Sequence, residues 1–153
     1  MNVNEMMDDA AFQLDATPMR IKPDDVSGAE TDGSTMYYDP GFLSQVQSAA
    51  GDDGVRFIVA HELGHQVGGM YVGGHAGEFM ADEFAARALA RMGASFGAIE
   101  SVFGFLNASD SKSHPSSSAR LANARRAYLD EPRLIEMDDS PRSVSRETAD
   151  LAI

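Results

Sequence analysis

The sequence predicts an α+β fold, a mainly helical domain with a small antiparallel sheet. In several segments apolar residues recur at helical spacing, and glycine, proline or serine separates these segments. Near the start of the chain, short β-prone stretches instead flank an Asp-Gly turn. We expect residues 1–130 to form one domain and the polar residues 131–153, which contain two prolines, to form a flexible tail.

The first forty residues supply the predicted sheet. A short helix is expected over 5–14, where the apolar pattern is partly helical. Residues 19–22 alternate like a strand, and residues 35–39 are rich in aromatic and β-prone side chains. Because the turn residues Asp32 and Gly33 precede the second stretch, a small antiparallel sheet is expected.

The remaining segments are predicted to be helices. One helix is expected over 42–51 and the next from 52 to about 67, with Gly51 and then Gly68-Gly69 as their ends. The later helices are expected from Gly77 or Glu78 to Met92, from Ser95 to Leu106, and from a serine cap at 116–118 to Leu129. A polar loop connects the last two helices.

Composition limits the class of protein and the kind of metal site. No stretch approaches the roughly 18–20 apolar residues of a membrane-spanning helix, and the first residues do not resemble a secretory signal. We therefore expect a cytoplasmic protein. The chain has no cysteine, so disulfides and thiolate ligands are excluded, and a metal would bind through histidine and carboxylate.

The formal net charge is −12, and many of the acids precede residue 54. A charge of this sign repels phosphate backbones and anionic lipids, which disfavours nucleic-acid and membrane binding. Solubility is the favoured interpretation of this charge. A preference for basic substrates is the alternative, and the oligomeric state is not predicted.

The most informative motif is the H-E-x-x-H sequence at residues 61–65. Histidines four residues apart in a helix lie one turn apart on the same face, so His61 and His65 can bind one metal ion. The glutamate between them, Glu62, is then placed beside the metal. This arrangement is typical of zinc hydrolases, although two histidines on a solvated helix face would show the same spacing.

A catalytic zinc site needs a third protein ligand. Tyr71 stands where the metzincin pattern H-E-x-x-H-x-x-G-x-x-H requires histidine, so that arrangement fails. His75 in the glycine-rich loop is one alternative. Glu78, at the start of the next predicted helix, is favoured, and Asp82 lies one turn further on the same face. Asp82 could accept a hydrogen bond from a ligating histidine.

The predicted reaction is peptide hydrolysis by a water molecule that zinc activates, with Glu62 as general base. A developing oxyanion also needs a hydrogen-bond donor. His114, which precedes Pro115, and Tyr71 are the two candidates for that role.

Taken together, these motifs resemble the gluzincin metallopeptidases. More narrowly, the chain resembles the soluble minigluzincins and the catalytic core of the CAAX prenyl endopeptidase and heat-shock membrane zinc protease family. The features that carry it are the H-E-x-x-H motif, Glu78-Phe79-Met80-Ala81-Asp82, and His114-Pro115 followed by Arg120-Leu121.

The resemblance implies a zincin-like fold with a single zinc ion bound by His61, His65 and Glu78. It further implies that His114 lies near the substrate and that Arg120 braces the site through an ion pair. Residues 36–43 resemble the family's edge strand and backing helix, where an extended peptide or protein substrate adds to the sheet. The membrane-spanning segments of the membrane members have no counterpart in this sequence.

Two other functions remain open. The string Ala81-Asp82-Glu83-Phe84-Ala85 partly resembles that of phage antirepressor proteases, which would imply one regulatory protein as substrate. A non-catalytic, zinc-stabilised binding module is the second alternative, but such a site has no need of Glu62.

Overall fold

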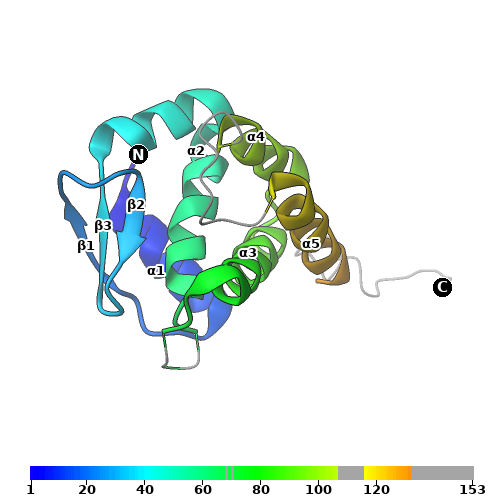
Figure 1. Ribbon diagram of the computed structural model, residues 1–153, viewed down its shortest axis with the longest axis horizontal. Coiled ribbons are helices and arrows are strands. Elements are labelled where there is room, and N and C mark those ends of the chain that lie inside the picture. The colour runs from blue at the N-terminus through cyan, green and yellow to red at the C-terminus, as the bar shows by residue number, and fades with distance from the viewer. Residues whose placement is uncertain (68, 70, 107–115, 132–153) are drawn as a thin grey trace, which may run out of the picture.

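The computed structural model describes residues 1–67, 69, 71–106 and 116–131. Its elements are α1 (Val3–Leu14), β1 (Arg20–Pro23), β2 (Ala29–Thr31), β3 (Thr35–Tyr38), α2 (Pro40–Gly64), α3 (Gly74–Arg91), α4 (Phe96–Leu106) and α5 (Ser117–Asp130). Figure 1 shows the small sheet on one side of the helices, which confirms the α+β class. Among the described residues, no helix has both the length and the apolar character needed to cross a bilayer.

The predicted small sheet is present, but it is mixed rather than antiparallel, because one of its two strand pairs is parallel. Its strand order is β1-β3-β2, with β3 parallel to β1 and antiparallel to β2. The sequence prediction missed β2, which forms a hairpin with β3 through the turn at Asp32 and Gly33. Since β2 reverses the chain between them, β1 and β3 run in the same direction.

The edge strand beside the central helix is also a different one from that implied by the family resemblance. Residues 36–38 belong to β3, which is the central strand, whereas β2 is an edge strand that contacts α2. β2 has only three residues, too few for an alternating pattern to stand out in the sequence.

Helix α2 contains both helices that were predicted over 42–51 and from 52 onward. It begins at a cap formed by Asp39, whose side chain accepts a hydrogen bond from the Gly41 amide. The helix is interrupted at Gly51, which has φ 72° and ψ −173°. Glycine adopts a positive φ at little steric cost, so the kink lies at the predicted boundary.

The second half of α2 lies at the centre of the molecule. It packs against α1, α3 and α4 (Figure 1), and its side chains Phe57, Val59 and Leu63 are fully or almost fully buried. The contact with α3 is especially close at Gly64. A Cβ atom at this position would lie 2.9 Å from the Cα and 3.0 Å from the carbonyl oxygen of Ala81.

The C-terminal helices complete this core. α3 packs against both α2 and α5, and α5 begins after Ser116, whose hydroxyl accepts a hydrogen bond from the Ala119 amide. Glu131, the first residue of the predicted tail, forms an ion pair with Arg91. Residues 132–153 lie outside the described part of the chain.

Candidate metal centre

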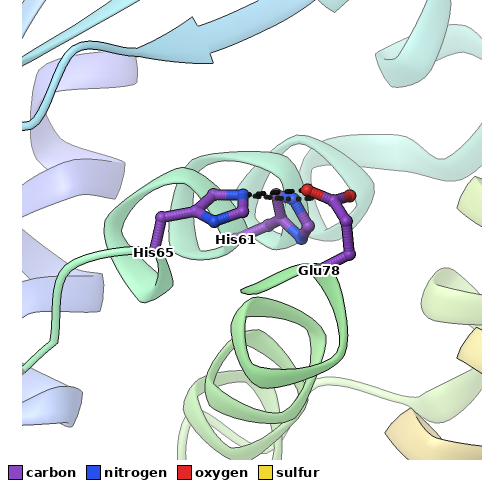
Figure 2. A group of neighbouring side chains, drawn as sticks. All are labelled: His61, His65 and Glu78. Carbon is purple, nitrogen blue, oxygen red and sulfur yellow. Dashed lines mark hydrogen bonds and ion pairs between the residues drawn. The ribbon is translucent and has the colours of Figure 1, made fainter. Parts of the chain in front are cut away.

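His61, His65 and Glu78 converge at the junction of α2 and α3 (Figure 2). The Nε2 atoms of the two histidines lie 3.2 Å apart. The carboxylate of Glu78 approaches both of them, at 3.1 Å from His65 Nε2 and 3.6 Å from His61 Nε2. Because the ligand atoms of all three residues lie within 4.8 Å of one another, this group could hold a metal ion.

The hydrogen bonds of the Nδ1 atoms determine which ring nitrogen of each histidine carries the hydrogen. His61 Nδ1 lies 2.9 Å from the Asp82 carboxylate, and His65 Nδ1 lies 2.8 Å from the carbonyl oxygen of Val72. A carbonyl oxygen and a carboxylate both accept, so each Nδ1 carries the hydrogen and donates it. In the neutral rings, both Nε2 atoms are therefore lone pairs that face each other and the Glu78 carboxylate.

Three lone-pair donors this close together could hold a metal ion between them, and the donor set suits zinc. Zinc binds histidine nitrogen and carboxylate oxygen at about 2.0–2.2 Å, which places donors in a tetrahedral site about 3.3 Å apart. The observed separations of 3.1, 3.2 and 3.6 Å are close to this value. The residues present thus fit a zinc ion with three protein ligands.

A buried ion pair supports the group from α5. Arg120 donates two hydrogen bonds to Asp82, from Nε at 2.7 Å and from a terminal nitrogen at 2.9 Å. The same terminal nitrogen lies 3.4 Å from Glu78. Asp82 is fully buried, so its charge depends on Arg120 and His61 for compensation. The structure therefore brings both predicted supporting residues to the site.

These contacts shift the pKa values of two metal-site residues in a direction that favours anionic Glu78. In the metal-free protein, burial alone would raise the pKa of Glu78. The hydrogen bond with the His65 ring, which requires a proton on Nε2 of that ring, and the charges of protonated His61 and of Arg120 lower it to about 2. Burial alone would lower the pKa of His61, and the hydrogen bond and charge of Asp82 outweigh it, so the pKa is raised.

Glu62 has a different environment. It is 7% exposed, and its carboxylate makes no hydrogen bond or ion pair with a residue in the described part of the chain. Burial raises its pKa to about 7, although His61 and His65 act in the opposite direction. A carboxyl group that titrates near neutral pH is suited to accept and release protons.

Of the residues considered as an alternative metal ligand or as an oxyanion donor, the two that the structure describes lie outside the converging group. His75 is exposed in the first turn of α3 and does not belong to the converging group. The ring of Tyr71 stacks on His65 with centroids 5.6 Å apart, and a Cβ atom at Gly73 would lie 3.3 Å from its hydroxyl. His114 and Pro115 lie outside the described residues.

Sequence reasoning missed the segment that holds His65 from the other side. The Val72 amide donates to the backbone carbonyl of His65, while the Val72 carbonyl accepts from its ring. Gly77 makes this contact possible, because a Cβ atom there would clash with the Val72 carbonyl. A backbone acceptor leaves no side-chain pattern in the sequence, and only the glycine at 77 could have pointed to a close approach.

Comparisons with known proteins give no independent identification: no protein-family model, curated protein or solved structure matches this chain.

Proposed function

We propose that this protein is a zinc-dependent endopeptidase. The observation that carries the proposal is the convergence of two histidine lone pairs and the Glu78 carboxylate, in which both histidines share a helix with Glu62. Glu62 is a buried carboxyl group that has no hydrogen-bond or ion-pair partner among the described residues. A metal site that served only to stabilise the fold would gain nothing from such a group, whose burial is unfavourable.

The proposed mechanism assigns one role to each residue around the site. When bound, zinc would activate a water molecule and polarise the scissile carbonyl. Glu62 would accept the proton of that water and deliver it to the leaving amine, a role for a buried carboxyl group that is not engaged by another described residue. Asp82 and Val72 orient the two histidine rings, and Arg120 balances the acidic charge.

The substrate would bind as an extended peptide along β2. This strand is the sheet edge that contacts α2, the helix that carries Glu62. An extended peptide that adds to a sheet edge forms backbone hydrogen bonds with that edge. Its scissile carbonyl is then held in an extended segment that water can attack.

The decisive experiment separates metal binding from proton transfer. Glu62→Gln should retain one zinc ion per chain, measured by atomic absorption, while peptide hydrolysis falls by about 10²–10⁴-fold. Glu78→Ala should lose the zinc ion as well as the activity. Glu83→Gln, a change on the same helix as Glu78 but outside the group, serves as the control and should retain both.

If Glu62→Gln cleaved peptides at the wild-type rate, the proposed mechanism would be excluded. If the wild type bound zinc and cleaved no peptide, a non-catalytic binding module would be favoured.

A further inference from the structure

The outer edge of β2 is prepared to receive another strand. The Asp39 amide donates to Gly28 and the Asp32 amide donates to Thr35, which fixes the alternation of hydrogen-bonded pairs in the β2–β3 ladder. By that alternation Glu30 pairs with β3, while the amides and carbonyls of Ala29 and Thr31 point away from it. No described strand pairs with this edge.

Glu30 is the charged side chain at the middle of this edge. It is exposed and forms no ion pair with another described residue. Lys22 on β1 and Glu30 on β2 both pair with Tyr37 of the central strand, so the ring of Tyr37 lies between them. The ammonium group of Lys22 lies over that ring and 4.0 Å from Asp24. The charge of Glu30 therefore faces solvent beside the free edge.

Glu30 also lies on the strand that packs against the helix of the metal centre. β2 contacts α2, and a Cβ atom at Gly33, in the turn that follows β2, would lie 3.6 Å from Oε1 of Gln66, the residue after His65. A peptide bound along β2 would thus pass Glu30 near the point of cleavage.

We infer that Glu30 selects a substrate with a lysine or arginine side chain close to the scissile bond. This inference rests on the proposed peptidase function. In an antiparallel addition through Ala29 and Thr31, the substrate residue opposite Glu30 lies in a non-hydrogen-bonded pair, in which side chains approach most closely. Opposite charges in such a pair attract and like charges repel.

The net charge of −12 gives this selection a long-range component. A strongly acidic protein attracts basic peptides and repels acidic ones before contact is made. Glu30 would therefore provide the local part of a preference for basic peptides, and the overall charge would provide the long-range part.

The test uses three sets of peptides that share one background sequence. Each set places a single lysine, glutamine or glutamate in turn at every position around the scissile bond. At one position the wild type should prefer lysine to glutamate by about fivefold or more in kcat/KM. Glu30→Gln should remove most of this preference, and Glu30→Lys should reverse it. The wild-type preference should shrink as salt is added.

Asp9→Lys is the matched control, since it changes the net charge as much as Glu30→Lys but lies on the exposed face of α1. It should retain the lysine preference at that position. An equal loss in both variants, or a preference unaffected by Glu30→Lys, would overturn the inference.

A binding measurement keeps this test separate from the proposed catalysis. The chain contains no tryptophan, so a single tryptophan in each peptide reports binding to zinc-loaded Glu62→Gln protein by fluorescence. Tighter binding of the lysine peptide that depends on Glu30 would support the inference even if no peptide were cleaved. Equal affinities for the lysine and glutamate peptides would refute it.

Discussion

At the scale of single residues, Glu62 makes a pH-dependent contribution to stability in the metal-free protein. Its pKa is raised from the ordinary 4.5 to about 7, because burial disfavours the charged form. Between these values the unfolded chain releases the proton and the folded chain retains it. Stability is therefore lost as pH rises from about 4.5 to about 7, by about 3 kcal/mol in total.

Glu62→Gln removes this cost, so the metal-free variant should be more stable than the metal-free wild type at pH 8. At pH 4.5 the difference should be much smaller, because most of the cost to the wild type appears only above that pH. Urea unfolding at the two pH values measures both differences. A gain of equal size at both values would show that the charge of Glu62 is not its cause.

Arg120 offers a second residue-scale prediction, because it compensates the fully buried Asp82 with two hydrogen bonds. Arg120→Ala should destabilise the protein by about 3–5 kcal/mol, since it leaves a buried carboxylate short of its main partner. Arg125→Ala, on the same helix, breaks an exposed pair with Glu100 and should cost less than about 1 kcal/mol. Chemical denaturation measures both changes, and similar losses would contradict the assigned role of Arg120.

At the scale of elements, the close approach of α2 and α3 determines whether Glu78 reaches the histidines. A Cβ atom at Gly64 would collide with the backbone of Ala81, which a side-chain rotation cannot relieve. Gly64→Ala should push the helices apart and weaken zinc binding at least tenfold, although Gly64 is not a ligand. Competition with a chelating dye measures the zinc affinity.

Gly104→Ala is the control for this prediction. Gly104 lies within α4, and a Cβ atom there would have no neighbour within 4 Å among the residues the structure describes. Alanine should stabilise that helix by about 0.5–1 kcal/mol and leave zinc affinity unchanged. Unchanged zinc affinity in Gly64→Ala as well would show that this approach does not position Glu78.

The elements also show which parts of the fold sequence patterns reveal. The helices were predictable because apolar periodicity extends over many residues and Gly51 and Ser116 mark boundaries. The topology of the sheet was not, because β2 spans only three residues, and one undetected strand changes which strand lies at the edge. Local patterns report periodicity, whereas strand order depends on contacts between distant segments.

At the scale of the whole molecule, the candidate metal centre joins three helices that are separate in sequence. The H-E-x-x-H spacing predicted the pair on α2, because four residues make one helical turn. The placement of Glu78 and Arg120 depends on how α3 and α5 pack against the rest of the molecule. The sequence motifs that contain these two residues could therefore suggest their placement but not determine it. Metal binding at this junction should therefore stabilise the entire fold.

We accordingly expect zinc to raise the midpoint of thermal unfolding, and a chelator to lower it. At free zinc one hundred times the Kd, the gain is about 2.7 kcal/mol. It should decrease with falling pH once His61 gains a proton, which begins above its ordinary pKa of 6.5 because that pKa is raised. Glu78→Ala should show little zinc-dependent gain at any pH, whereas His75→Ala should match the wild type. Calorimetric scans with and without zinc at pH 8 and pH 5 measure these gains, and a full gain in Glu78→Ala would exclude Glu78 as a ligand.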